Sequence, residues 1–576
     1  MSTSPASLLL QPRTYEPAHF DETTRAMLRA TVDWFEKRGK TRLMADYHAH
    51  VFYSDFLDFV ADEGIFATFL TPAAEGDGAP DKRWDTSRIA AMSELLGFYG
   101  LNYWYPWQVT ILGLGPVWQS GNDVARKRAS IALQSGAVAA FGLSEKEHGA
   151  DIYSTDMVLT PDGQGGYRAS GGKYYIGNGN CAETVSVFGR IDGVAGPDQY
   201  VFFYANAKHD NFELVKNIVP TQMYVAEFRL NDYPVSDEDI LHTGAEAFSA
   251  ALNTVNIGKF NLCFGGIGLS THAFYEAITH AHNRILYGAP VTNFPHVRAE
   301  FVEAFARLIA MKLFSDRAVD YFRSAHESDR RYLLFNPVTK MKVTTEAEKV
   351  LALLSDIVSA KAFEKDSYVA IARTDVAGLP KLEGTVAVNL ALIMKFMPAY
   401  LLDPQPFEPV PTRSEAADDD FLFRQGPARG LSKIRFHDWR PVYRQFAALP
   451  NVAVFTEQAE KLAELVASQA GGGDQAADLD LALAVAELFT LVVYGQLILE
   501  QADILDLDRD VVDQIFAVLI RDFSSRAVEL HGKAGATPQQ QAWAIEAIRR
   551  PVIDSALYER VWNQVVALAG AYAMTP

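Results

Sequence analysis

The stretch from Phe141 to Cys181 constrains the fold of this chain more than any other part of the sequence. It opens with Leu-Ser-Glu-Lys-Glu-His-Gly-Ala-Asp, ending at Asp151, and closes with Lys-Tyr-Tyr-Ile-Gly-Asn-Gly, ending at Gly179. Short apolar runs separated by Asp-Gly and Gly-Gly lie between these segments, which predicts β-strands joined by tight turns. Glycine-bearing loops at both ends allow a backbone to approach a flat ligand closely. The sequence therefore predicts a ligand-binding β-domain.

The length and composition of the chain limit its class. With 576 residues it should form about two to four domains. A net charge of −19 argues against nucleic acid and anionic membranes as partners, because both would repel it. Its two cysteines, Cys181 and Cys263, do not form a disulfide framework, and Cys and His do not cluster at zinc spacing. We expect no metal site and a cytoplasmic location.

The remainder of the chain has mainly helical patterns. Apolar residues recur at three and four positions over 246–402, and Pro, Asp and Glu predict a linker over 403–420. Residues 421–576 form another helical region, with a break at Gly471–Gly473 and an apolar run from Leu481 to Leu499. Glu487 and Gln496 interrupt this run, so a buried helix is expected and no membrane span. We predict an α+β fold that is mainly α, with a helical domain over 1–140, a β-domain over 141–245, a helical domain over 246–402, a linker over 403–420 and a helical extension over 421–576.

Four motifs resemble those of the acyl-CoA dehydrogenase family. The stretch from Phe141 to Cys181 is similar to its flavin-binding β-domain, and Tyr233 to Gly244 is similar to the segment that leaves this domain. Arg284-Ile-Leu-Tyr-Gly288 resembles the family's "RxxFG", with Tyr in place of Phe. Lys381-Leu-Glu-Gly-Thr385 resembles the segment with the catalytic "EGT". The resemblance implies an N-terminal helical domain, a central β-barrel-like domain and a helical bundle, and 421–576 resembles the extra helical domain of very-long-chain members.

The resemblance implies FAD as the cofactor. The positions that match its contacts in the family are Phe141, Leu143, Ser144, Gly149, Ala150, Tyr175, Gly177, Arg284, Asp356 and Thr385. In the family the arginine meets the FAD pyrophosphate of a neighbouring subunit, which implies a homodimer. Four positions depart from the pattern, because Ala150, Tyr175, Gly177 and Asp356 replace Ser, Trp, Thr and Gln. Each lost hydrogen bond is worth about 0.5–1.5 kcal/mol, so we expect weaker retention of FAD.

Glu383 is the candidate catalytic base. Taken alone, it is a carboxylate near the positive end of a helix dipole. In the family, however, the glutamate of "EGT" is the base. Glu383 lies at close to the family's usual sequence separation from the "RxxFG" arginine, which is Arg284 here. Some members have the base at a second position, which by spacing corresponds to Gly258 in this chain. Glycine cannot accept a proton. We expect burial to raise the pKa of Glu383 towards neutrality, and we expect Asn256 and Lys259 to meet the substrate.

The resemblance implies oxidation of a fatty acyl-CoA to the trans-2-enoyl-CoA, with electrons passed to an electron-transfer flavoprotein in fatty-acid β-oxidation. Two alternatives stay open: an acyl-CoA oxidase that uses oxygen, and a dehydrogenase of a carrier-protein thioester. A DNA-associated flavoprotein of the same fold is disfavoured, because such a role requires a basic C-terminal face and this one is acidic.

Overall fold

The computed structural model describes residues 3–426, 430–469 and 478–576. They divide into two compact units, and each unit combines distant parts of the chain. The sheet unit comprises Glu16–Gly265, Ser414–Arg429 and Met574–Pro576, and the helical unit comprises Met1–Tyr15, Gly266–Arg413 and Gly430–Ala573. The break predicted at Gly471–Gly473 lies outside the described residues.

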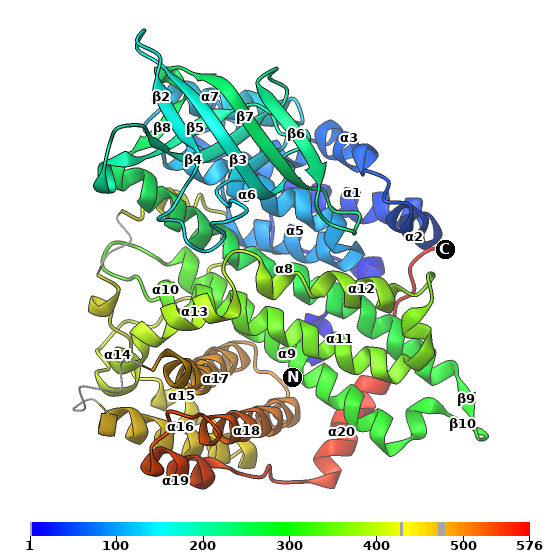
Figure 1. The fold of residues 1–576 in the computed structure, drawn as a ribbon. Helices are drawn as coiled ribbons and strands as arrows, with labels where there is room; N and C mark the ends of the chain where they lie inside the picture. The colour runs from blue at the N-terminus through cyan, green and yellow to red at the C-terminus, as the bar shows by residue number, and fades with distance from the viewer. Residues whose placement is uncertain (1–2, 427–429, 470–477) are drawn as a thin grey trace. The chain divides into compact units, whose positions relative to one another are not determined.

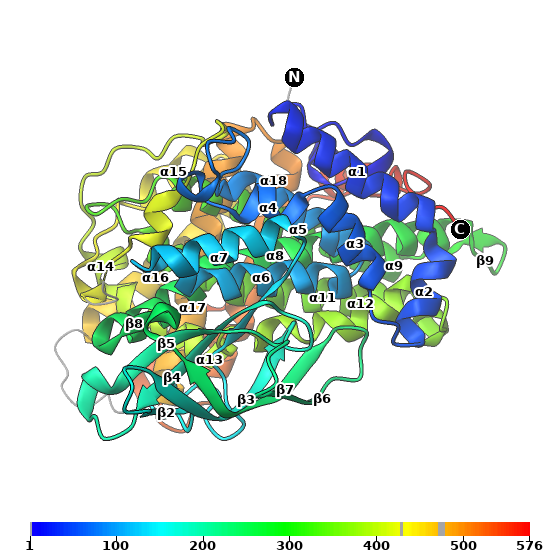
Figure 2. The same cartoon turned by 90° about the horizontal axis from the view of Figure 1, so that it is seen from above.

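The sheet unit begins with helices. They are α1 (Glu22–Arg38), α2 (Lys40–His48), α3 (Ser54–Asp62), α4 (Ile65–Leu70), α5 (Thr86–Tyr99), α6 (Leu101–Gln119) and α7 (Asp123–Gln134). Side chains of Asp21, Asp85 and Asn122 accept hydrogen bonds from the first turns of α1, α5 and α7, so these starts are encoded locally. Helix α6 contacts α5 and α7 and is buried on nearly all sides (Figure 2).

Eight strands of the described residues form one twisted sheet (Figure 1). They are β1 (Ala139–Gly142), β2 (Val158–Pro161), β3 (Tyr167–Gly177), β4 (Thr184–Ile191), β5 (Tyr200–Ala205), β6 (Phe212–Asn217), β7 (Val225–Val235) and β8 (Ile240–Thr243). Their order is β6-β7-β3-β2-β4-β5-β8, with β1 parallel to β4. Antiparallel β2 and β3 pair Val158 with Ser170, which is the strand–turn–strand pattern expected from Asp-Gly and Gly-Gly.

Helix α6 lies against β1 and β4. The approach is close at Gly113, where an added Cβ would lie 2.5 Å from the backbone nitrogen of Ala140. The hydroxyl of Ser186 on β4 donates to the Gly113 carbonyl at 2.7 Å. Glycine is therefore needed on this face of α6, and the helix positions β1, which leads into the first flavin motif.

Helix α8 (Gly244–Asn283) begins in the sheet unit and ends in the helical unit. The helical unit continues with a β9–β10 hairpin (Ile285–Leu286, Ala289–Pro290), α9 (Pro295–Arg323), α10 (Tyr332–Val338), a π-helical turn (Thr339–Val343), α11 (Thr344–Val358), α12 (Tyr368–Val376), α13 (Val386–Ile393) and α14 (Met397–Leu402). The extension adds α15 (Arg440–Gln445), α16 (Pro450–Gln469), α17 (Leu479–Ile504), α18 (Arg509–His531), α19 (Pro538–Ala547) and α20 (Ser555–Val566).

Helix α17 contains the apolar run found in the sequence. It is long and apolar enough by composition to cross a membrane, but 83% of its apolar window is buried inside the protein. It contacts α9 and α18, and its Glu487 lies 3.7 Å from Arg526 of α18. A buried core helix was the expected structure of this segment.

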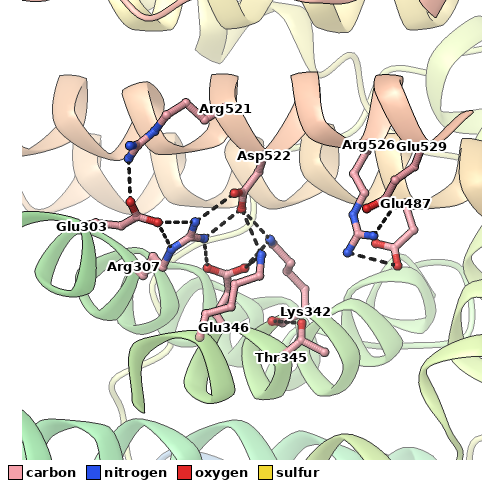
Figure 3. A network of polar contacts seen from close by, with 11 residues as sticks. Glu303, Arg307, Lys342, Thr345, Glu346, Glu487, Arg521, Asp522, Arg526 and Glu529 are labelled. Carbon is pink, nitrogen blue, oxygen red and sulfur yellow. Dashed lines mark hydrogen bonds and ion pairs between the residues drawn. The ribbon is translucent and has the colours of Figure 1, made fainter. Parts of the chain in front are cut away.

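A buried cluster of charges joins α18 of the extension to α9 and α11 (Figure 3). The Arg307 guanidinium lies 2.6 Å from Glu346 and 2.8 Å from Asp522, and it also pairs with Glu303. The Lys342 ammonium lies 2.6 Å from Glu346. Buried ions are stabilising only when they are paired, so the three helices depend on one another at this point.

Candidate active site

The predicted flavin contacts of the sheet unit lie on β1 and β3 and in the loop that follows β1. Phe141 is on β1, and Leu143 and Ser144 directly follow that strand. The backbone N–H of Tyr174 on β3 donates to the Ser144 carbonyl at 3.0 Å. This hydrogen bond brings the two halves of the motif together.

A buried ion pair ties the two halves more strongly. The Lys173 ammonium lies 2.6 Å from Glu145 and also donates to the Leu143 carbonyl at 3.1 Å. Glu145 further accepts from the Thr155 hydroxyl at 2.6 Å and from the backbone N–H of Asp156 at 2.7 Å. Both residues belong to the motif, but their pairing was not predicted from the sequence. The structure makes this pair the support of the loop over 145–157.

The two groups of this pair have shifted pKa values. Burial acts to raise the pKa of Glu145, but the Lys173 ammonium and the hydrogen bonds outweigh it and hold this pKa below its ordinary value. Burial lowers the pKa of Lys173, and Glu145 acts in the opposite direction. The carboxylate is thus charged at neutral pH and keeps the loop ordered.

Tyr175, a predicted flavin contact, lies at an irregular point of the sheet. The pairing of β3 with β7 is irregular between Lys173 and Ile176, and Tyr175 there has a positive φ of 65°. Its side chain is 60% exposed. At Gly149, in the other half of the motif, an added Cβ would meet nothing within 4 Å. An exposed aromatic side chain, the Ser144 hydroxyl and a glycine with open space around it fit a planar ring system such as a flavin.

Glu383 lies in a tight loop of the helical unit, between the short helix Leu379–Lys381 and α13. Its φ is 52°, that of Gly384 is 91°, and the Oε2 atom of Glu383 is buried. A glutamate in the left-handed region is uncommon and is found mainly where the surroundings impose it. Thr385, predicted to contact the cofactor, caps α13 by accepting from the backbone N–H of Val388 at 3.4 Å.

Other predicted residues lie on separate elements. Arg284 is exposed at the end of α8 and precedes a hairpin whose turn residues, Tyr287 and Gly288, have positive φ values of 52° and 80°. This is the turn geometry that favours a two-residue hairpin. Asp356 is exposed on α11, and on α8 Asn256 is half-buried and Lys259 is buried.

Gly258, the alternative base position, lies on α8 and has a structural contact. Its backbone carbonyl accepts a hydrogen bond from the Gln108 side chain at 2.9 Å. This contact holds α8 against α6. Glycine has no side chain that could accept a proton.

Comparison with known proteins adds independent support. Residues 247–397 match the family model of the acyl-CoA dehydrogenase C-terminal domain. The chain is 21% identical to the short-chain-specific acyl-CoA dehydrogenase of Megasphaera elsdenii, over 56% of this chain and 86% of that one. It is 22% identical to the caffeyl-CoA reductase–Etf complex subunit CarC of Acetobacterium woodii, over 51% of this chain and 78% of that one.

The fold extends this likeness to nearly the whole chain. The structure of an acyl-CoA dehydrogenase from Bacillus anthracis complexed with FAD matches with a TM-score of 0.74 and 14% identity. The match covers 98% of this chain and 96% of that one. The chain has the acyl-CoA dehydrogenase fold, and residues 247–397 match the C-terminal-domain model of that family. The predicted fold class, with its extended C-terminal helical region, is confirmed, and these matches support the predicted family and oxidoreductase class.

One departure from the acyl-CoA dehydrogenase pattern has a structural cause. At Gly177, where the family has threonine, an added Cβ would lie 2.5 Å from Val109 and 2.7 Å from Tyr105 of α6. The following residue, Asn178, donates to the carbonyls of Pro106 and Ala139 at 3.1 and 2.9 Å. Helix α6 thus occupies the space that a threonine side chain would need.

Replacing Gly177 by threonine should therefore destabilise the protein by about 1–3 kcal/mol, because an overpacked side chain forces α6 and β3 apart. Chemical denaturation of the apoprotein measures the change. Gly149→Ala is the matched control and should change stability by no more than about 0.5 kcal/mol, because its site is open. Equal effects of the two substitutions would contradict the packing described at Gly177.

Proposed function

We propose that this protein catalyses the α,β-dehydrogenation of a fatty acyl-CoA to the trans-2-enoyl-CoA, with FAD as electron acceptor and Glu383 as base. One observation carries the proposal. The carboxylate at the family's base position lies in a strained loop, with one oxygen buried and the backbone on both sides of it hydrogen-bonded to buried side chains. A carboxylate that serves only a helix dipole does not need this geometry.

The chemistry assigned to Glu383 follows from the substrate. The α-hydrogen of a thioester is weakly acidic, so a carboxylate with restricted access to water can remove it as a proton. FAD, when bound, supplies the acceptor for the β-hydrogen and its electron pair. Loss of the α-proton to Glu383 and of the β-hydrogen with two electrons leaves the enoyl thioester. Negative charge that develops on the thioester oxygen requires N–H or O–H donors, and the resemblance assigns the backbone N–H of Glu383 to this role.

Ser144, Tyr175 and the loop around Gly149 are the residues proposed to hold the flavin ring. Arg284, which is exposed, is proposed to bind the pyrophosphate of FAD in a second subunit, because a guanidinium offers a planar fork to phosphate oxygens. This role requires a homodimer. Ala150 lacks the family's hydroxyl, and Asp356 places a carboxylate where the family has an amide. Weaker retention of FAD during purification is therefore part of the proposal.

The electron acceptor proposed is an electron-transfer flavoprotein, and the setting is cytoplasmic fatty-acid β-oxidation. The curated relative from Acetobacterium woodii is named as a subunit of an Etf complex, which favours this acceptor over oxygen. Asn256 and Lys259 are proposed to meet the CoA part of the substrate.

A series of acyl-CoAs of increasing chain length, mixed anaerobically with the FAD-loaded protein, tests the proposal. We expect loss of the oxidised flavin absorbance, fastest for one range of chain lengths. Reoxidation should be rapid with an electron-transfer flavoprotein and slow in air, with little peroxide. Rapid peroxide release would instead indicate an oxidase, and reduction only by carrier-bound thioesters would indicate a carrier-dependent enzyme. A flavin that none of these thioesters reduces would refute the function.

A further inference from the structure

A buried lysine contacts the loop of Glu383 on both sides of the glutamate. Lys340 lies in the π-helical turn Thr339–Val343, and its side chain is fully buried. Its ammonium donates to the carbonyl of Pro380 at 2.6 Å and to the carbonyl of Gly384 at 2.5 Å. Pro380 precedes Glu383 by three residues, and Gly384 directly follows it. The two hydrogen bonds therefore span the loop.

Asn389 holds the same loop from its C-terminal side. Its buried side-chain amide donates to the carbonyls of Gly384 and Thr385 at 3.0 and 2.9 Å. The Gly384 carbonyl thus accepts from both Lys340 and Asn389. Glu383 and Gly384 both have positive φ values, and such a conformation persists only when its surroundings impose it. These two side chains supply the restraint.

We propose that Lys340 is a positioning residue for catalysis: by holding the carbonyls of Pro380 and Gly384, it keeps the Glu383 carboxylate where it can take the α-proton. This inference rests on the proposed role of Glu383 as base. Lys340 does not exchange protons with the substrate in this account. It acts on the backbone that carries the base, and charged donors form stronger hydrogen bonds to carbonyls than neutral ones do.

Lys340 makes this contact from the π-helical turn Thr339–Val343. Pro337, at the end of α10, lacks the N–H that would continue the regular hydrogen-bond ladder, and the turn begins two residues later. Lys340 and Lys342 are two positions apart, so they lie on different faces of the turn. Lys342 pairs with Glu346 in the charge cluster of Figure 3, whereas Lys340 contacts the Glu383 loop. Lys342 is thus a matched control, because it is also buried, lies in the same turn and is outside the proposed site.

The test compares Lys340→Met with Lys342→Met in the FAD-loaded protein. Lys340→Met should slow the maximal rate of flavin reduction by acyl-CoA about 100-fold, the effect of misplacing a reacting group by about 1 Å, without weakening the binding of an enoyl-CoA product. Amide hydrogen exchange should become faster over residues 379–385. Lys342→Met should lower the unfolding midpoint but keep wild-type exchange in this loop and a wild-type reduction rate.

Hydrogen exchange separates this inference from the proposed function, because it requires no substrate. If no thioester reduces the wild-type flavin, the proposed function fails. Independently of that result, unchanged hydrogen exchange over residues 379–385 in Lys340→Met would overturn the proposed restraint of the loop. If Lys340→Met does not fold, Asn389→Ala should produce smaller changes in the same direction. Wild-type reduction by folded Lys340→Met, or an equal slowing by Lys342→Met, would overturn the positioning role.

Discussion

Replacing Glu383 by glutamine should slow the reduction of bound FAD by acyl-CoA by about 10²–10⁴-fold, the usual contribution of a general base. The amide has nearly the shape of the carboxylate, so the loop, the FAD site and the binding of enoyl-CoA should be retained. Only the capacity to accept the α-proton is lost. Anaerobic stopped-flow absorbance of the oxidised flavin measures the rate directly.

A second carboxylate near the same loop provides the control. Glu348 on α11 lies 3.6 Å from Lys381, which lies two residues before Glu383. Glu348→Gln removes a charge of the same kind close by and should leave the rate of flavin reduction unchanged. Reduction of Glu383→Gln at the wild-type rate, or an equal loss in Glu348→Gln, would contradict the assignment of Glu383 as base.

Replacing Arg307 by methionine should lower the free energy of unfolding by about 3–5 kcal/mol, the usual cost of leaving buried charges without their partner. The buried Glu346 and the partly buried Asp522 would keep their charges and lose the guanidinium between them (Figure 3). Urea unfolding of the whole chain measures the loss. The control is Arg521→Met, because Arg521 pairs with Glu303 at 3.0 Å and is 49% exposed. An exposed pair should contribute no more than about 1 kcal/mol.

The same charge cluster also affects how the free energy of unfolding depends on pH. Burial acts to raise the pKa of Glu346, but Lys342, Arg307 and Lys349 outweigh it and hold this pKa well below its ordinary value. Burial also acts to raise the pKa of Asp522, but the hydrogen bond from Arg307 acts to lower it, and this pKa is lowered as well. Their contribution is complete above the ordinary carboxyl pKa of about 4 and is lost as pH falls through the lowered values. In Arg307→Met both folded-state pKa values should rise, so the loss of stability in acid should be smaller and should be complete at a higher pH. Parallel pH dependence of unfolding in the two proteins would contradict this account.

Local features of the fold were predictable from the sequence because local chemistry encodes them. The Asp-Gly and Gly-Gly turns give the β2–β3 hairpin, and Asp21 and Asp85 cap the helices that follow them. The apolar run of α17, interrupted by Glu487 and Gln496, correctly indicated a buried helix. The domain boundaries drawn from composition remain predictions, since composition describes contiguous segments whereas each compact unit combines distant ones.

Contacts between residues far apart in the sequence could not be predicted in this way. Arg307 and Asp522 are 215 positions apart, and each alone has the pattern of a solvated charge on a helix. Lys340 is 44 positions before Gly384, and only the folded π-helical turn directs it to that carbonyl. Lys173 and Glu145 are both part of the motif in the sequence. Their pairing depends on how β3 lies beside the loop after β1, which the sequence does not show.

One anaerobic turnover of the FAD-loaded wild-type protein with its fastest acyl-CoA, followed by flavin absorbance and by the mass of the thioester, tests the proposed dehydrogenation most directly. We expect the flavin to lose its colour as an equal amount of thioester loses the mass of two hydrogen atoms, and we expect neither change in Glu383→Gln on the same time scale. A thioester that keeps its mass while the flavin remains oxidised would contradict the account.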